Sequence, residues 1–209
     1  MGIGKFNFSV FFDNLIKAEI KDKNFSIDSN KIAIPIQKHT SNVKFVKETG
    51  IYNNFDGLIS SKKYNITIAI KVADCVPIYI YDKENESYGL IHSGWRGTNN
   101  KIIINALDIF FNFINSSPKN IFIFIGPHIQ KCCYEVDLDV AQYFTYVKKK
   151  SKQNKWFLDL SSEIKDDILK TGIPLANIQI SDICTYESLD CESFRRDGEK
   201  SDRMIGVIN

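Results

Sequence analysis

"LIHSGWRGTNN" occupies residues 90–100 and marks the change from a strand pattern to a helical pattern. His92 follows the apolar run 88–91, which we expect to be a strand. Gly94 and Gly97 come next, and we expect them to let the backbone turn tightly as strand becomes helix. The stretch therefore predicts a histidine at the end of a strand, with a helix N-terminus following it.

The same turn predicts a site for an anion. Free N–H groups at a helix N-terminus favour negative charge. Arg96 lies inside the turn, and its planar guanidinium can hold a phosphate or carboxylate through two hydrogen bonds. We therefore predict that Arg96 is a catalytic residue that positions an anionic group. The alternative is a simple turn, with Trp95 in the core and Arg96 in a surface ion pair.

Outside this stretch, strand and helix patterns alternate irregularly. Apolar or alternating runs predict strands at residues 6–12, 65–72, 77–81, 88–91, 121–125, 177–180 and 204–208. Amphipathic segments predict helices at 99–114 (N-cap Thr98), 138–147 (N-cap Asp137) and 162–170 (ending near Gly172). Because there is no regular βαβ rhythm, we expect an α/β fold of the mixed α+β kind, with sheets flanked by helices.

Composition sets the broad class. The 209 residues are 44% hydrophobic, so the default is one domain over residues 1–209, with 148–155 as a polar stretch that could be a flexible insertion. The net charge of +2 indicates neither a nucleic-acid nor a membrane partner. No run reaches the ~20 apolar residues that span a bilayer. The five cysteines are an odd number, which fits a reducing cytoplasm better than a disulfide framework.

Three residues have side chains that bind borderline-soft metals: His39, Cys75 and His92. Each lies at a strand end or in a loop, where side chains from distant segments can converge. Two imidazoles and one thiolate leave a fourth position open, as in catalytic zinc sites. The alternative is two hydrogen-bonded histidines and a buried thiol.

Two nearby residues have more than one candidate role. Asp74 precedes Cys75, and we predict that it accepts a proton or orients a ligand histidine, although it could equally cap a turn. His128 lies in a Gly-Pro turn, where we expect it at the surface or behind the metal ligands.

The remaining candidates are cysteines and arginines. Cys132 and Cys133 would face opposite ways on a strand, so we expect one buried thiol and one near the pocket rather than a joint metal site. Arg195, Arg196 and Arg203 form a basic cluster that either closes over the pocket or is solvated surface.

The motifs and their order resemble the laccase-domain family, also described as purine nucleoside phosphorylase, polyphenol oxidase or peptidoglycan editing factor proteins. The matching pieces are QKH (37–39), FDGLIS (55–60), ADCVPIYIYD (73–82), IHSGWRGT (91–98), IGPHIQKCCYEV (125–136), LDL (158–160), SDICT (181–185) and SFRRDG (193–198). The resemblance implies one domain of mixed α/β layers with a metal pocket at one end of the sheets. It also implies that His39, Cys75 and His92 are zinc ligands.

This chain departs from the family pattern at three places. Thr40 replaces the usual glycine, Phe194 replaces a tyrosine, and Asp202-Arg203 replaces Gly-Arg. The metal ligands are retained, so the departures bear on substrate choice and rate.

The resemblance implies phosphorolysis of adenosine, inosine, guanosine or methylthioadenosine, and deamination of adenosine. Zinc activates water for attack on a purine ring, and Arg96 could hold the phosphate. Three histidines are too few for multicopper chemistry, and a blue-copper site would usually want an axial methionine, for which only Met1 and Met204 exist. Two alternatives remain: a zinc amidase that edits a peptidoglycan precursor, and an inactive metal-binding interaction domain.

Overall fold

Alternation along one central strand decides the layering of the molecule. In the computed structural model, which describes residues 5–26, 28, 30–150 and 154–209, all seven residues of β8 (Val76–Asp82) are buried. Ile78 and Ile80 pack toward the helices, whereas Tyr79 and Tyr81 pack toward a second sheet. A strand covered on both faces is apolar at nearly every position.

Two six-stranded sheets and one small sheet make up the β-structure, and both large sheets mix parallel and antiparallel pairs. The first sheet has the order β1 (Phe6–Asn7), β2 (Ala18–Lys21), β15 (Met204–Ile208), β7 (Thr67–Val72), β3 (Ile32–Ile36), β5 (Gly50–Asn53). The second sheet has the order β14 (Ile178–Ile180), β10 (Ile121–Ile125), β8, β9 (Ser87–Ser93), β6 (Gly57–Ser61), β4 (Val43–Phe45). The small sheet has the order β11 (Glu135–Val136), β13 (Trp156–Leu158), β12 (Val147–Lys149).

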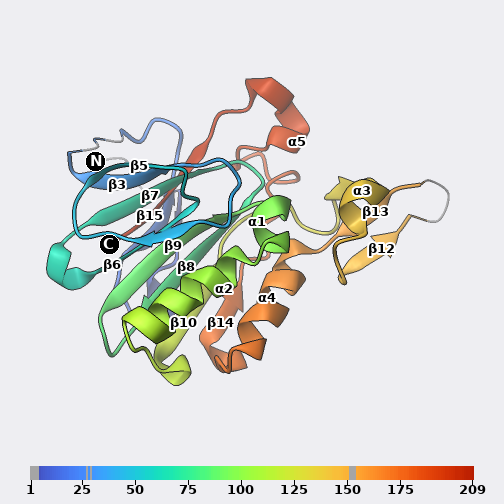
Figure 1. The fold of residues 1–209 in the computed structure, drawn as a ribbon. Helices are drawn as coiled ribbons and strands as arrows, with labels where there is room; N and C mark the ends of the chain where they lie inside the picture. The colour runs from blue at the N-terminus through green and yellow to red at the C-terminus, as the bar shows by residue number, and fades with distance from the viewer. Residues whose placement is uncertain (1–4, 27, 29, 151–153) are drawn as a thin grey trace.

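Helices cover the outer face of the second sheet. The helices on this face are α1 (Trp95–Asn99), α2 (Ile102–Asp108) and α4 (Leu160–Lys170). By contrast, α3 (Leu138–Ala141) packs on β13, and α5 (Phe194–Asp197) lies in the C-terminal segment before β15. Figure 1 shows α2 and α4 side by side over β8, β9 and β10, while the first sheet lies on the opposite side. None of the helices in the described part of the chain combines the length and apolarity that a bilayer crossing requires.

The hydrophobic core therefore has two layers. One lies between the second sheet and the helices, where Ile78, Ile91 and Leu107 are fully buried. The other lies between the two large sheets and includes Tyr79 and Ile68. These mixed α/β layers confirm the predicted fold class, whereas the expectation of a single domain over residues 1–209 stays a prediction.

Several predicted elements differ from the structure. The strand at 6–12 covers only Phe6–Asn7, because the Asn7 side chain accepts the Ser9 N–H and starts a 3₁₀ turn over Ser9–Phe12. The helix at 138–147 ends at Ala141, and Val147 begins β12. The Asp137 side chain makes no capping hydrogen bond at the start of α3.

The helix predicted at 99–114 begins earlier and is broken. It starts at Trp95, stops at Lys101, whose φ of 59° is left-handed, and resumes as α2 with a π-helical turn over Ile109–Phe113. Thr98 is not the N-cap, because its hydroxyl donates to the Gly94 carbonyl from within α1. The predicted insertion at 148–155 begins within β12 and ends just before β13, and its residues 151–153 lie outside the described residues.

Candidate metal centre and its cavity

The structure brings the three predicted metal ligands together from both large sheets. His39 follows β3, Cys75 connects β7 to β8, and His92 lies in β9. Their ligand atoms all lie within 4.8 Å of one another, and the Cys75 Sγ is 3.8 Å from the His39 Nε2. The group is therefore assembled by the meeting of two sheets rather than by one local motif.

Asp56 holds both histidines in place. It is fully buried immediately before β6, and it accepts hydrogen bonds from the backbone N–H groups of Lys38, His39 and Thr40. It also accepts the Thr40 hydroxyl at 2.8 Å and lies 2.9 Å from the His92 Nδ1. These bonds hold His39 in a left-handed conformation, with a φ of 58°, that a non-glycine residue rarely adopts. Thr40, which departs from the family pattern, thus adds one hydrogen bond to this network.

Sequence reasoning did not identify Asp56 as a site residue. The feature of the sequence that could have identified Asp56 is an acidic residue directly before the apolar run 57–59. A carboxylate buried at such a position needs several hydrogen-bond donors.

Gly94 is required by close packing, not by the tight turn that we predicted. Its φ of −83° is accessible to any residue. A Cβ atom at this position would lie 2.9 Å from the Cys75 Sγ and 3.1 Å from the His39 Cδ2. Any larger residue would therefore displace two of the three ligands.

The ligands perturb one another's protonation. Burial raises the pKa of the Cys75 thiol, but His92 and His39 lower it by more, to about 6. Burial lowers the pKa of His92, but the Cys75 thiolate and Asp56 raise it by more, to about 9. Between these values the metal-free protein holds a thiolate beside an imidazolium.

This donor set fits zinc. Two imidazole nitrogens and one thiolate are ordinary zinc ligands, and they leave one coordination position open. Since the His92 Nδ1 bonds to Asp56, its Nε2 is the atom available to a metal. His128 does not join the set: it is buried rather than at the surface, and its Nδ1 lies 2.8 Å from the Gly126 carbonyl.

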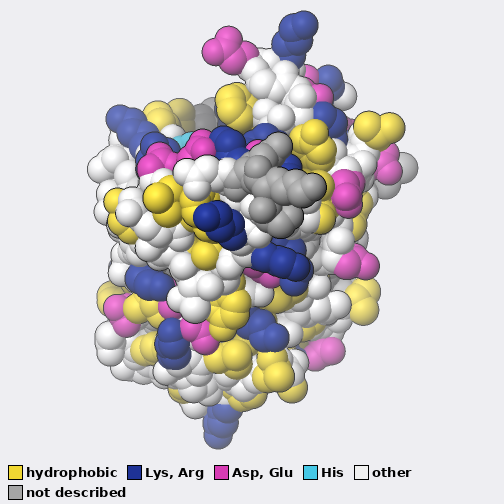
Figure 2. All heavy atoms as spheres, turned by 90° about the vertical axis from the view of Figure 1, so that its right-hand side faces the viewer, with side chains coloured by type: hydrophobic (Ala, Val, Ile, Leu, Met, Phe, Trp, Pro, Cys, Tyr) yellow, Lys and Arg dark blue, Asp and Glu magenta, His cyan; other side chains and the backbone are white. Residues whose placement is uncertain are grey.

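A cavity of about 800 Å³ opens beside the metal centre. Its lining includes the metal ligands and Asp74, a group of apolar side chains, two aromatic side chains and three cations. The apolar residues include Ile34, Pro35, Ile36, Ile51 and Ile129, the aromatic ones are Tyr134 and Phe194, and the cations are Lys71, Arg195 and Arg203. Figure 2 shows a histidine surface near the top of one face, among cationic and anionic side chains.

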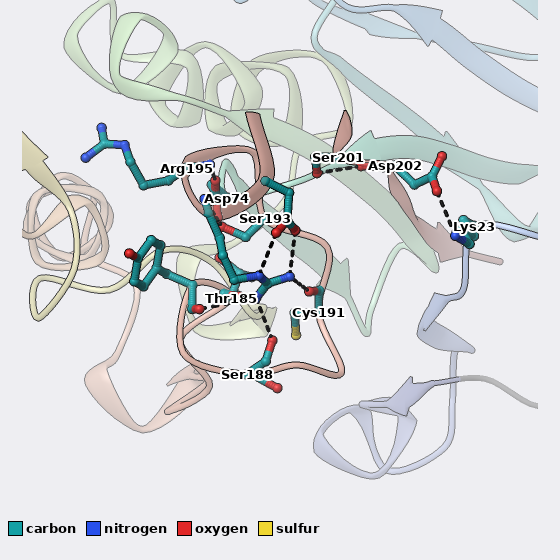
Figure 3. A network of polar contacts seen from close by, with 12 residues as sticks. Lys23, Asp74, Thr185, Ser188, Cys191, Ser193, Arg195, Ser201 and Asp202 are labelled. Atoms are coloured by element: carbon teal, nitrogen blue, oxygen red, sulfur yellow. Dashed lines mark hydrogen bonds and ion pairs between the residues drawn. The ribbon is translucent and has the colours of Figure 1, made fainter. Parts of the chain in front are cut away.

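Asp74 connects the cavity to the C-terminal segment. Its Oδ1 accepts the Thr185 hydroxyl at 2.7 Å, and its Oδ2 accepts the Arg195 backbone N–H at 2.6 Å (Figure 3). Asp74 is nearly buried and has a left-handed φ of 77°. The carboxylate therefore borders the cavity in a fixed orientation, and its predicted part in proton transfer stays a prediction.

The predicted arginines separate into three environments. Arg96 is exposed, stacks on the Trp95 ring with its Cζ 4.3 Å from the ring centroid, and is not among the described residues that line the cavity. Arg195 and Arg203 do line it. Arg196 instead donates to the carbonyl groups of the loop that precedes α5, including that of Cys191 (Figure 3).

The adjacent cysteines also differ from expectation. Cys132 and Cys133 lie in a turn rather than on a strand, so their sulfurs are 3.4 Å apart instead of facing opposite ways. Neither lines the described cavity. Both are close to Cys184, the buried thiol of the group.

Known proteins resemble this chain over most of its length. Residues 17–209 match the family model described as multi-copper polyphenol oxidoreductase laccase. Proteins named purine nucleoside phosphorylase are 34% identical in Borreliella burgdorferi, over 88% of this chain and 82% of the relative, and 31% identical in Aquifex aeolicus, over 85% and 82%.

Solved structures share the fold. YlmD from Geobacillus stearothermophilus has a TM-score of 0.81 and 27% identity, covering 86% of this chain and 73% of its own. The hypothetical protein YfiH from Bacillus licheniformis has a TM-score of 0.82 at 24% identity, and the match covers 94% of this chain and 93% of YfiH. The match to residues 17–209 and the relatives at 34% and 31% identity show that the chain belongs to the multi-copper polyphenol oxidoreductase laccase family.

Proposed function

We propose that the chain is a zinc enzyme that cleaves purine nucleosides by phosphorolysis. The observation that supports this proposal is the cavity, whose lining combines the candidate ligands His39, Cys75 and His92 with an apolar wall and three cations. Relatives named purine nucleoside phosphorylase, at 34% and 31% identity, support the same class of substrate.

Zinc rather than copper suits the donors of this chain. Multicopper oxidation needs a mononuclear copper and a trinuclear cluster, both bound mainly by imidazole. The sequence has three histidines, and the structure draws two of them to the centre while His128 bonds elsewhere. His39, Cys75 and His92 would hold the zinc, which would supply Lewis acidity and a water of lowered pKa.

The cavity wall can bind the two substrates separately. Apolar side chains such as Ile34, Ile51 and Phe194 offer a surface for the purine and ribose. Arg195 and Arg203 offer planar guanidinium groups for phosphate. The neighbouring acidic residues Asp202 and Asp197 pair with Lys23 and Arg196, so they do not neutralise these two arginines.

Phosphorolysis exchanges one bond at the ribose. A phosphate oxygen attacks C1′, the bond from C1′ to the purine nitrogen breaks, and the purine leaves with the electron pair and takes up a proton. Asp74 is our candidate for moving that proton, because its carboxylate borders the cavity next to Cys75. Deamination of adenosine needs activated water but no phosphate, and we propose it as a second activity of the same cavity.

The test is a turnover assay with purified protein. Adenosine, inosine, guanosine and methylthioadenosine are each incubated with and without phosphate, and free base and ribose 1-phosphate are measured. We expect both products only with phosphate, and no turnover in Cys75→Ser. Arg203→Ala should raise the KM for phosphate at least tenfold, because a charge-assisted hydrogen bond contributes about 1.5–3 kcal/mol.

Arg96→Ala is the matched control, since it removes an arginine that lies outside the lining. We expect it to change the phosphate KM less than threefold, and a rise only in this variant would place the phosphate at α1. Base release without phosphate, or turnover of a peptidoglycan-precursor amide and of no nucleoside, would contradict phosphorolysis.

A further inference from the structure

A second group of metal-binding side chains lies outside the cavity lining. We define the cysteine cluster as Cys132, Cys133, Cys184 and Glu187. Its three sulfurs and one carboxylate oxygen all lie within 4.8 Å of one another. The sulfurs come from two segments about fifty residues apart, and all three cysteines are free thiols.

The backbone holds the two segments together beside the sulfurs. His128 and Cys184 form a parallel β-bridge, and the Thr185 N–H donates to the His128 carbonyl at 3.1 Å. The Gln130 side chain donates to the Ser181 carbonyl at 2.9 Å, and the Gln130 N–H donates to the Cys184 Sγ at 3.5 Å. The thiols are thus preorganised, so a metal would not have to gather them from separate loops.

A turn explains how adjacent cysteines can share one ion. The N–H groups of Cys133 and Tyr134 both donate to the Gln130 carbonyl at 2.9 Å, which curls the chain so that both sulfurs lie on the same side. In a tetrahedral site with Zn–S bonds of about 2.3 Å, the sulfurs lie roughly 3.8 Å apart. The observed 3.4 Å between the Cys132 and Cys133 sulfurs needs only a small adjustment.

We propose that the cysteine cluster binds a second zinc ion in a closed structural site. Three thiolates and one carboxylate fill all four tetrahedral positions, so no position is left for a substrate. Thiolates select thiophilic ions, and the carboxylate favours zinc over copper(I) among them. Binding displaces the three thiol protons to solvent.

The site would fix one wall of the cavity. Cys132 and Cys133 lie between Ile129 and Tyr134, which both line it. Cys184 directly precedes Thr185, whose hydroxyl bonds to Asp74. A zinc ion in the cluster would therefore join the segment that carries this wall to the segment that orients Asp74. The proposal does not depend on the reaction that the cavity catalyses.

The experiment measures zinc per chain after purification of the full-length protein under reducing conditions. We expect about two zinc ions in the wild type and about one in Cys184→Ser, in Cys132→Ser and in Cys75→Ser. Cys132→Ser and Cys75→Ser combined should retain none. Cys191→Ser is the matched control, because Cys191 is as buried as Cys184 but belongs to neither group; it should retain two.

Cobalt(II) substitution identifies which site each variant loses, because thiolate-to-cobalt absorption in the near ultraviolet grows with the number of bound thiolates. Cys75→Ser should lose about a quarter of this absorption and keep the rest. Cys132→Ser is suited to this test because its side chain is exposed, and circular dichroism checks its fold. One zinc in the wild type, unchanged zinc in Cys184→Ser and Cys132→Ser, stoichiometric copper, or a metal-free Cys132–Cys133 disulfide would each overturn the proposal.

Discussion

At the scale of single residues, the proposed metal centre depends on Asp56 as much as on the candidate ligands. Five hydrogen bonds converge on this carboxylate: three from consecutive backbone N–H groups, one from Thr40 and one from His92. Burial raises the pKa of Asp56, but these bonds lower it by more, to about 2. The ionised carboxylate thus contributes roughly 2 kcal/mol of stability above its unfolded pKa, which is lost as the pH falls through about 2.

Asp56→Asn should therefore weaken zinc binding without removing a ligand. The amide still fills the space, but it cannot accept all five bonds, and His92 loses its charged partner. We expect the zinc Kd to rise about 10–100-fold, as for other residues that orient metal ligands. Competition with a chromophoric chelator measures this.

Asp82→Asn controls for loss of stability alone. Asp82 is also fully buried, and it accepts hydrogen bonds from Glu84 and Asn85 outside the metal centre. The Asp82→Asn variant should have a lower melting temperature but an unchanged Kd for zinc. A wild-type Kd in Asp56→Asn would show that His92 is oriented without the carboxylate.

At the scale of elements, the β7–β8 connection holds the C-terminal segment against the cavity. Asp74 lies in this connection and bonds to Thr185 and to the backbone of Arg195 at the start of α5 (Figure 3). The left-handed φ of Asp74 costs roughly 1–3 kcal/mol in a non-glycine residue, which these bonds must offset. Asp74 is therefore a structural tether, and proton transfer would be an additional role.

A pair of substitutions separates the two roles of Asp74. Asp74→Asn keeps the shape of the side chain but removes its basic oxygens, so proton transfer predicts a loss of about 10²–10⁴-fold in kcat with zinc content unchanged. Thr185→Val breaks one tether bond but leaves the carboxylate in place, so we expect a loss of less than tenfold. If both variants lose similar rate and similar melting temperature, Asp74 acts only as a tether.

The sequence predicted some elements and site residues well for physical reasons. The cores of β8, β9, β10 and β15 have long β-branched or aromatic runs, which outweigh other signals. The short strands β4, β5 and β11 depend on pairing with segments elsewhere in the chain, and β12 and β13 are three residues each, too short for periodicity to detect. The left-handed Lys101, whose ammonium pairs with Asp167 on α4, likewise interrupts a helix through a tertiary contact.

The candidate site shows the same division between residues that the local sequence predicts and residues that only tertiary contacts bring in. Chemistry and the family resemblance indicated His39, Cys75 and His92, which the structure brings together. The glycine-flanked turn after His92, at a predicted helix N-terminus, favours Arg96, yet the cavity is lined by Arg195 and Arg203 from about a hundred residues later. The pairing of β15 with β7 and β2, together with the hydrogen bonds of Asp74, places that segment there.

At the scale of the whole molecule, the metal centre joins the two large sheets. His39 follows a strand of the first sheet, whereas His92 lies within the second, and Cys75 connects the two. A zinc ion bound to all three would therefore cross-link two layers that meet mainly through apolar packing, with a hydrogen bond from the Tyr79 hydroxyl to the Glu19 carbonyl. Zinc bound to these three residues in the folded state only would stabilise the entire molecule.

This stabilisation should weaken as the pH falls. In the metal-free folded protein between pH 6 and 9, Cys75 is a thiolate and His92 holds a proton, since their pKa values are about 6 and about 9. Zinc displaces that one proton, so its Kd should rise about tenfold for each unit of pH lost, which is about 1.4 kcal/mol. Below pH 6 the thiolate is protonated too, and the loss becomes steeper. For a chain of this length, 1 kcal/mol corresponds to about 2–4 °C in Tm, so the rise in Tm caused by zinc should shrink by about 3–6 °C per pH unit.

Calorimetry of Cys132→Ser with zinc or with EDTA at pH 9, 7.5 and 6 measures this change in Tm in a variant whose cysteine cluster is disabled. Adding Cys75→Ser should abolish the zinc effect at every pH, and a zinc effect independent of pH would mean that no proton is displaced from the Cys75–His92 pair.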